Sequence, residues 1–312
     1  MLFSKTSLLL LLGAILALPS CSSDPEQARL SSEARALDGQ AQGLYNASYA
    51  AEKAGEVSSA VKGYKKINRL YPMSPIAAES QYRVSRLLQN DGELLKAFES
   101  YNSFLKNYPA SSHYADAMKQ QEVIAHNVAN GQIKNSFLGW KSRIDAKRTA
   151  EMLTKVRNNA PRSVSAEKAQ FTIGTMYRSR KNPQKAIEAF RILTRDYPLS
   201  QYAPEAQYQI GAMLLDEAKG GNQDAANLDR ARNAFEDLLI RHPGSKRAAD
   251  AKRQISKISS GDTQRSYDIA EFYRKKGQNR SAILYYKEVV RTSNPGPLRN
   301  KAQAKISELG GS

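Results

Sequence analysis

A short phrase that recurs along this chain constrains its fold more than any other feature. It reads LYPMSPIAAESQY at 70–82, NYPASSHYADAM at 107–118 and DYPLSQYAPEAQY at 196–208, with a degenerate copy, RHPGSKRAADAK, at 241–252. Each copy joins a ring-bearing residue and a proline to a serine and an alanine-rich run. Because proline stops a helix and alanine favours one, the phrase is typical of the boundary between consecutive helices.

The residues before each proline are also periodic. Twelve positions before the proline stands an alanine, and four positions after that alanine stands a ring, in the pairs Ala60 and Tyr64, Ala97 and Tyr101, Ala186 and Phe190, and Ala231 and Phe235. A small residue allows two helices to approach closely, and a ring one turn later lies on the same helix face. We expect the serine after each proline to cap the next helix.

These positions resemble the tetratricopeptide repeat, in which two antiparallel helices form a hairpin that stacks on the next one. The resemblance implies an all-α superhelix of about six helical hairpins plus a closing helix, and the alternative is a helical bundle without repeat order. The hairpins are expected at about 42–72, 76–109, 114–161, 166–198, 203–243 and 270–295. We also expect a joining helix at 248–258, a closing helix at 301–309, and insertions near 130–144, around Trp140, and at about 219–228.

The first twenty residues have the features of a bacterial lipoprotein signal. Lys5 precedes the apolar run Leu8–Leu18, which is too short to cross a bilayer as a helix and leads to Cys21. Cys21 is the chain's only cysteine, so no disulfide can form within the chain. The alternative is an ordinary secretory signal with a bystander cysteine. We expect a signal peptide over 1–20 and acylation of Cys21, with Ser22 indicating the outer membrane, at its periplasmic face.

The rest of the chain divides by its repeats. A polar segment at 21–40 is expected to be the lipidated tether. The N-terminal repeats, including the insertion near 130–144, are expected over 41–164, and the C-terminal repeats with the closing helix over 165–312.

A formal net charge of +17 is compatible with three kinds of anionic partner: nucleic acid, an acidic membrane surface or an acidic protein. An exported protein does not meet nucleic acid, and the basic clusters lack the interleaved aromatic residues of a single-strand binding groove. We therefore expect no nucleic-acid partner. Solvated helix faces are the simplest interpretation of each cluster by itself.

The sequence contains no constellation that is typical of catalysis. His113 and His126 are too far apart to face together as metal ligands on one helix turn, and His242 occupies the ring position before proline. No phosphate-binding glycine loop and no nucleophile motif is present in the sequence. We expect no enzymatic activity, no metal and no cofactor.

The first helix of each hairpin, helix A, is expected to line the inner surface of a repeat stack. The inward positions are Tyr45, Tyr49 and Glu52 in the first hairpin, and Tyr82, Arg86 and Gln89 in the second. Tyrosines beside charged groups are typical of protein-binding hot spots, so these six residues predict a protein-binding groove. The alternative is that the tyrosines only close gaps between helices, with their hydroxyls in water.

The lipoprotein signal, the tether and the repeats together resemble the BamD-type lipoproteins of the outer-membrane β-barrel assembly machinery. The resemblance covers most of the mature chain and is carried by three stretches. These are LYNASYAAEKAGEVSSAVKGYKKINRLYPMSP at 44–75, ARNAFEDLLIRHPGSKRAADAKRQI at 231–255 and YDIAEFYRKKGQNRSAILYYKEVV at 267–290.

This resemblance implies a non-catalytic scaffold with several partners. They are a BamA-like barrel protein with POTRA domains, other assembly subunits, unfolded outer-membrane protein segments in the N-terminal groove, and outer-membrane lipid through the acylated Cys21. Arg265, Tyr267, Phe272 and Arg274 are implied to face the BamA-like partner. The family tends to carry an arginine in the stretch that here contains Gly261.

A second family shares part of the pattern. Tetratricopeptide envelope proteins of the YbgF (CpoB) type, which act with Tol–Pal or in cell-wall synthesis, contain the same YPxSxYAxxA phrase. They usually carry a trimerising N-terminal coiled coil and no lipoprotein signal, whereas residues 22–40 here lack sustained heptads.

Overall fold

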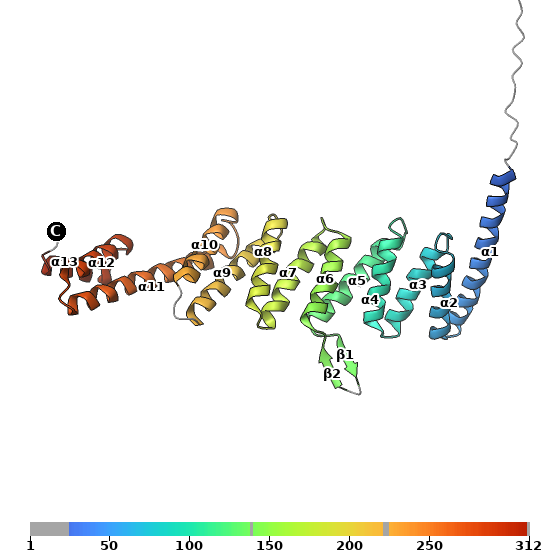
Figure 1. The fold of residues 1–312 in the computed structure, drawn as a ribbon, viewed down its shortest axis with the longest axis horizontal. Coiled ribbons are helices and arrows are strands. Elements are labelled where there is room, and N and C mark those ends of the chain that lie inside the picture. The colour runs from blue at the N-terminus through green and yellow to red at the C-terminus, as the bar shows by residue number, and fades with distance from the viewer. Residues whose placement is uncertain (1–24, 138–139, 221–224, 311–312) are drawn as a thin grey trace, which may run out of the picture. The chain divides into compact units, whose positions relative to one another are not determined.

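The computed structural model describes residues 25–137, 140–220 and 225–310 (Figure 1). Cys21 and the signal segment 1–20 lie outside the described residues. The described part contains thirteen helices and one β-hairpin. In chain order these are α1 (Pro25–Lys53), α2 (Val57–Leu70), α3 (Ala77–Asn90), α4 (Leu94–Asn107), α5 (Tyr114–Ala129), β1 (Lys134–Phe137), β2 (Trp140–Arg143), α6 (Ala146–Asn159), α7 (Val164–Ser179), α8 (Pro183–Asp196), α9 (Ala203–Gly220), α10 (Ala225–Arg241), α11 (Ala248–Lys275), α12 (Asn279–Thr292) and α13 (Pro297–Glu308).

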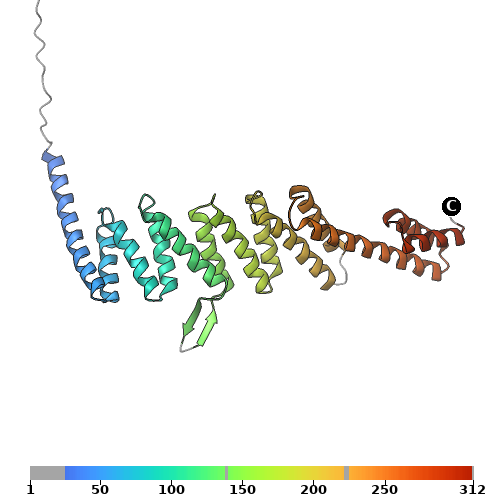
Figure 2. The same ribbon diagram turned by 180° about the vertical axis from the view of Figure 1, so that it is seen from behind.

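The chain forms two compact units, Met1–Val84 and Ser85–Ser312, and the boundary between them falls within α3. In the N-terminal unit α1 packs against α2. In the C-terminal unit the helices from α4 to α10 follow one another side by side in both views (Figures 1 and 2). The helix pairs α5–α6, α7–α8, α9–α10 and α11–α12 are the hairpins, and α13 packs against α12. The all-α tetratricopeptide-repeat fold with a closing helix is confirmed.

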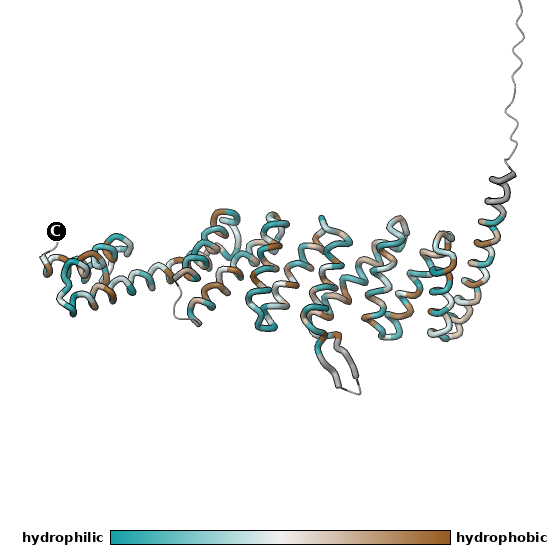
Figure 3. Tube along the Cα trace, viewed as in Figure 1, coloured by the Kyte–Doolittle hydropathy of each residue, from teal (hydrophilic) through white to brown (hydrophobic). Residues whose placement is uncertain are grey.

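The small residues and rings of the repeat lie where their spacing predicted. Every alanine of the four pairs is fully buried, and so is every ring; the residues are Ala60, Ala97, Ala186, Ala231, Tyr64, Tyr101, Phe190 and Phe235. Figure 3 shows apolar and polar stretches alternating along the helices of the C-terminal unit. Helix α8 is an example, because it buries the stripe of Ala186, Phe190 and Leu193.

Two glycines lie against the buried phenylalanine rings of α8 and α10. A Cβ atom on Gly174 of α7 would lie 2.5 Å from Cε1 of Phe190, and one on Gly211 of α9 would lie 2.7 Å from Cε1 of Phe235. Real Cβ contacts are not this short, because dispersion gives way to repulsion below about 3.5 Å. The absence of a side chain on helix A is thus what makes room for the phenylalanine of the second helix of the hairpin, helix B.

The serine after each proline caps the next helix only once. Helix α9 begins at Ala203, whose N–H donates to the carbonyl oxygen of Ser200 at 3.0 Å, so Ser200 opens a turn that precedes the helix. Ser74, Ser111 and Ser245 accept in the same way. Ser163 alone among the five serines stands at the helix boundary, where its Oγ accepts the Ala166 N–H at 3.2 Å. The prediction of a serine cap was therefore wrong at the other four positions.

The insertion predicted near 130–144 forms the hairpin of β1 and β2. The strands pair antiparallel, with Lys134 opposite Arg143 and Phe137 opposite Trp140. Figure 1 shows the hairpin projecting from the connection between α5 and α6. The insertion thus extends from a loop of the third repeat and leaves the stacking of α5 and α6 intact.

Two segments are more continuous than the sequence indicated. The joining helix expected at 248–258 is the first part of the 28-residue helix α11, because Gly261 continues the helix instead of breaking it. Residues 25–40, which were expected to belong to a tether, are helical and run without a break into the first repeat as α1. None of the helices described in 25–310 has both the length and the apolar character that a bilayer crossing requires.

Candidate functional site

The N-terminal unit contains a cluster of tyrosines on its first two helices. Tyr45 and Tyr49 lie one turn apart on α1, and their rings stack with a centroid distance of 6.3 Å and an interplanar angle of 4°. Tyr64 of α2 lies beneath them, with its ring centroid 5.5 Å from that of Tyr45. Offset ring pairs at such distances are favourable beyond the area they bury.

A cation from α3 covers these rings. The Arg83 guanidinium lies 5.0 Å from the centroid of the Tyr49 ring and 5.8 Å from that of Tyr45. The Lys53 ammonium lies 5.4 Å from the Tyr49 ring. Both cations are within the distance at which a ring face attracts positive charge.

Glu52 holds the ring layer and the cation together. Its Oε2 accepts the Tyr64 hydroxyl at 2.7 Å, and both of its carboxylate oxygens accept Arg83 Nη1 at 3.1 Å. Arg83 Nε also donates to Oε1 of Glu79 at 2.7 Å. We call Tyr45, Tyr49, Glu52, Tyr64 and Arg83 the tyrosine cluster.

The surroundings of Tyr45, Tyr64 and Arg83 keep the two hydroxyls protonated and the guanidinium charged. Burial, and then the hydrogen bond to Glu52, raise the pKa of Tyr64 well above its ordinary value. Burial also raises the pKa of Tyr45, although the Arg83 charge opposes it. Burial, the largest single cause, would lower the pKa of Arg83, but the Glu52 hydrogen bond and the electrostatic interactions with Tyr45, Glu52 and Glu79 together outweigh it and raise the pKa. Neither tyrosine is a proton acceptor at neutral pH, so the cluster is suited to binding and not to acid–base chemistry.

Part of the tyrosine cluster is accessible to a partner. Tyr49 is 37% exposed, whereas Tyr64 is fully buried. The side chains of Arg83 and Glu52 are 26% and 24% exposed. The surface that remains is a tyrosine ring flanked by Arg83 and Lys53, which can contact apolar and aromatic side chains through the ring.

A related arrangement in the C-terminal unit shows which contacts of the tyrosine cluster also occur as ordinary packing between helices. The Arg247 guanidinium lies 4.6 Å from the centroid of the Tyr208 ring and is paired with Glu205 and Asp250. The hydrogen bonds to Glu205 and Asp250 raise the pKa of Arg247. A cation over a helix A ring is therefore a recurrent packing element of these repeats. What the N-terminal unit adds is a second, exposed tyrosine, Tyr49.

The structure brings together only half of the groove residues expected from the sequence. Tyr45, Tyr49 and Glu52 are adjacent, but Tyr82 is only 8% exposed and buries its ring. Arg86 is exposed, and Gln89 accepts the Tyr101 hydroxyl at 2.6 Å while its amide donates to Gln120. The last two belong to the C-terminal unit, which the structure describes as a separate body.

Arg83 belongs to the tyrosine cluster but was not predicted from the sequence. It lies one position after Tyr82, about 100° further round α3, and so falls just outside the stripe of Tyr82, Arg86 and Gln89 that was predicted. Its spacing of four residues from Glu79 was the available signal, because an acid and an arginine at i and i+4 pair on one helix face.

The four residues implied to face a BamA-like partner all lie on α11. Phe272 is 52% exposed, with the Lys276 ammonium 4.4 Å from its ring centroid. Arg265 pairs with Asp262 at 3.2 Å. Tyr267 packs edge-on against Tyr286 of α12, with centroids 5.4 Å apart.

Arg274 completes this set through an ion pair. Its Nη2 lies 2.8 Å from Oε2 of Glu271, and this hydrogen bond lowers the pKa of the Glu271 carboxyl. Phe272 is thus the exposed apolar residue among the four, and Tyr267 contributes to the packing of α11 on α12. A Cβ atom on Gly261 would meet nothing within 4 Å, so a larger side chain fits at that position.

Within the described part of the chain, no group of three or more histidine, cysteine, aspartate or glutamate residues lies close enough to hold a metal ion. His126 is buried on α5 beside Glu122, and His242 lies at the end of α10.

Comparison with known proteins identifies relatives of the whole repeat region. A family model described as the outer membrane lipoprotein family YfiO matches residues 37–214 and again 138–304. The outer membrane protein assembly factor BamD of Neisseria gonorrhoeae is 28% identical over 158 residues, which is 46% of this chain and 57% of that protein. The match thus spans just over half the length of this curated relative.

Solved structures of other repeat proteins are more distant. A tetratricopeptide repeat protein from Parabacteroides merdae is 14% identical, covering 86% of this chain and 98% of its own, with a TM-score of 0.29. YrrB, described as a repeat protein with an unusual peptide-binding site, is 17% identical over 78% of this chain and 100% of its own, with a TM-score of 0.30. The apo form of RapI is 13% identical, covering 91% of this chain and 82% of its own, with a TM-score of 0.35. TM-scores this low decide nothing about how the repeats are arranged.

Proposed function

This chain belongs to the YfiO family of outer membrane lipoproteins, and from this membership we propose that it is the BamD-like scaffold subunit of the machinery that assembles outer-membrane β-barrel proteins. The observation that carries the proposal is the family match, which extends over residues 37–214 and 138–304 and so includes all six hairpins. The relative from Neisseria gonorrhoeae supports it. In this role the protein binds partner proteins and performs no bond-making step.

The tyrosine cluster is the part of the scaffold suited to unfolded barrel segments. Strands of membrane barrels alternate apolar and polar residues and are flanked by aromatic girdles. The exposed face of Tyr49 offers a ring to such side chains, while Arg83 and Glu52 fix its orientation. A preorganised ring loses little conformational entropy on binding, and this favours capture of a disordered chain.

The second contact in this proposal is the exposed face of α11. Phe272, with Arg265 nearby on the same helix, is the contact for the POTRA domains of a BamA-like protein. Aromatic residues and arginines are enriched at the centres of protein interfaces. Tyr267 and Arg274 support this face through their contacts with Tyr286 and Glu271.

The anchor in this proposal is the acylated Cys21 at the periplasmic face of the outer membrane. In the sequence Cys21 lies four residues before Pro25, where α1 begins. Several acyl chains on one cysteine give stable membrane attachment, whereas a single chain binds only marginally. Mass spectrometry of the mature N-terminus tests this step by its acyl mass on Cys21.

One experiment tests the proposed function as a whole. The chain, tagged at its C-terminus, is recovered from solubilised envelopes, and co-purified proteins are identified by mass spectrometry. Recovery of a POTRA-bearing barrel protein, lost in Phe272→Ala and kept in Leu284→Ala, supports the proposal; Leu284 is a matched control because it is 67% exposed on α12. Recovery of Tol–Pal components or murein synthases in place of the barrel protein would overturn it.

A further inference from the structure

A basic groove lies across three helices of the C-terminal unit and takes no part in the function proposed above. It has a volume of about 730 Å³ and runs between α8 and α10, with α9 as its floor. Four arginines line it, Arg191 and Arg195 from α8, and Arg230 and Arg241 from α10. We call these four residues and Asp237 the arginine groove.

Most arginines of this groove have no acidic partner among the described residues. The guanidinium groups of Arg191 and Arg241 are exposed, and neither has a partner among the residues that the structure describes. Arg230 donates to the neutral side chain of Asn227 at 2.9 Å. Only Arg195 has an acidic partner, its neighbour Asp196 at 2.7 Å, and its side chain remains 73% exposed.

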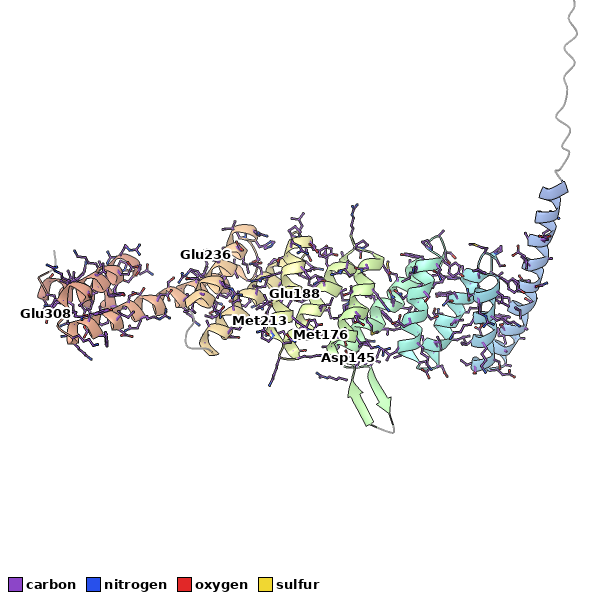
Figure 4. The ribbon with its side chains drawn as sticks, viewed as in Figure 1. Asp145, Met176, Glu188, Met213, Glu236 and Glu308 are labelled. Carbon is purple, nitrogen blue, oxygen red and sulfur yellow. The ribbon has the colours of Figure 1, made fainter. Side chains whose placement is uncertain are left out.

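The acids on the same helices do not neutralise the groove. Asp237 is the one carboxylate in the lining, and within the described residues it forms no ion pair. Asp229 is paired with Arg232 at 2.9 Å on another side of α10. Figure 4 labels Glu188 on α8 and Glu236 on α10, and neither residue belongs to the lining.

The side chains at the floor of the groove are buried, and its polar group is hydrogen-bonded within the protein. Ile210 and Leu214 of α9 are only 3% and 1% exposed, so they offer a partner little apolar surface. The buried amide of Gln207 donates to the carbonyl oxygen of Ala234 at 2.9 Å. Recognition in this groove must therefore come from the charged walls.

The chemistry of the walls selects the ligand. Arginine presents a planar fork that binds a carboxylate through two parallel hydrogen bonds, and it stays charged at any physiological pH. Four such forks around one aspartate make a site for several carboxylates. A groove between two helices admits an extended or helical chain, whereas the headgroups of a bilayer form a plane that contacts only the rim. We propose that the arginine groove binds a carboxylate-rich segment of a partner protein.

The test measures binding of a defined acidic peptide to the full-length protein in non-ionic detergent. The probe is a fluorescein-labelled dodecapeptide of alternating Glu and Ala, followed by fluorescence anisotropy at low salt. Arg191→Gln with Arg241→Gln is expected to raise the Kd about tenfold, because two charge-assisted contacts are lost. Asp237→Asn is expected to lower the Kd about twofold to threefold by removing a repulsive carboxylate. A misfolded variant would lose affinity, so a gain of affinity in Asp237→Asn cannot be explained by damage to the fold.

A charge-matched control separates this groove from the general positive charge of the chain. Arg162→Gln with Arg280→Gln also removes two exposed arginines, and its Kd is expected to stay within about twofold of the parent. An equal loss in this control overturns the proposal, and so does equal binding of a peptide with Gln in place of Glu. It is also overturned if phosphatidylglycerol vesicles, but not the acidic peptide, lose affinity when Arg191 and Arg241 are replaced.

Discussion

The Tyr101 hydroxyl of α4 donates to Oε1 of Gln89 on α3 at 2.6 Å. In the N-terminal unit the Tyr64 hydroxyl donates to Oε2 of Glu52 at 2.7 Å, and the two residues are again twelve positions apart. Tyr286 of α12 donates to Glu271 of α11. Where the ring of helix B is a tyrosine, helix A thus supplies a polar acceptor. Where the ring is a phenylalanine, helix A supplies a glycine, Gly174 or Gly211.

The first prediction concerns the space that glycine leaves. Gly174→Ala is expected to lower the free energy of unfolding by about 1 to 3 kcal/mol, because the new Cβ overlaps the buried ring of Phe190. Urea denaturation measures the change. Gly261→Ala is the control, since its Cβ meets nothing within 4 Å on α11 and alanine favours a helix. A destabilisation of the same size in both variants would contradict the steric explanation.

The second prediction concerns the rings themselves. Phe190→Ala and Phe235→Ala are each expected to cost about 3 to 5 kcal/mol of stability, because both rings are fully buried and leave a cavity. The comparison is Phe272→Ala, which removes a 52% exposed ring and is expected to cost less than about 1 kcal/mol. Losses below about 1 kcal/mol at Phe190 and Phe235 would remove these rings from the core.

The third prediction concerns acid. His126 of α5 is buried and its Nδ1 lies 3.2 Å from Thr172 Oγ1, whereas its Nε2 has no hydrogen-bond partner among the described residues. Burial, and then the nearby Lys168 charge, lower the pKa of His126 to about 4, although Glu122 at 3.7 Å opposes them. Since the unfolded chain takes up this proton first, stability is lost as the pH falls from about 6.5 towards 4, by about 1 to 2 kcal/mol at pH 5.

Thermal unfolding from pH 7 to pH 5 checks this slope. His126→Gln is expected to flatten it, because glutamine keeps polar contacts without titrating. Burial raises the pKa of Glu122, but its hydrogen bonds to Ser165 and Lys168 outweigh this and lower it. That contribution is therefore lost as the pH falls from the ordinary glutamate pKa through the lowered one, and little of the loss falls between pH 7 and pH 5. A slope between pH 7 and pH 5 that is unchanged in His126→Gln would contradict the assignment.

The fourth prediction separates the two proposed contacts. Tyr49→Ala is expected to weaken capture of an unfolded outer-membrane protein segment about tenfold while helix content stays unchanged, because Tyr49 is 37% exposed and its loss leaves Tyr64 buried. Binding of a POTRA-bearing partner should be unaffected by Tyr49→Ala and reduced by Phe272→Ala. Surface plasmon resonance with each partner measures both constants. Equal effects of the two variants on both partners would mean that neither residue marks a separate site.

The repeat architecture was predictable because its signals are local and steric. A proline at a helix end, an alanine at a close contact and a ring one turn later, as in Ala186 and Phe190, leave a fixed spacing in the sequence. The glycines opposite the rings were partly predictable, since Gly174 falls in register with Ala186. Gly211 has the same contact with Phe235, yet the extra residues predicted as an insertion at about 219–228 take it out of that register. In the structure α9 runs to Gly220 and α10 begins at Ala225.

Other features were not predictable, because they depend on choices between similar conformations. The joining helix was predicted to end at 258, but a helix accommodates Ser260 and Gly261 at a cost of about 1 kcal/mol, and α11 continues. The β-hairpin lies in an insertion, where no other copy of the repeat offers a comparison. Arg83 and Arg86 lie less than one turn apart, so the sequence alone did not decide which of them reaches the α1 rings.

The pairing of ring and helix A residue makes each hairpin a matched set. A chimera that joins the α3 helix, with Gln89, to the α8 helix, with Phe190, would leave an amide facing an apolar ring. The reverse exchange, α7 with α4, would replace Gln89 by Arg178 twelve positions before the ring, so the Tyr101 hydroxyl would lose its acceptor. Whole hairpins are therefore the natural blocks for gene duplication, deletion or engineering in this protein, and cuts between helices A and B are expected to yield mismatched modules.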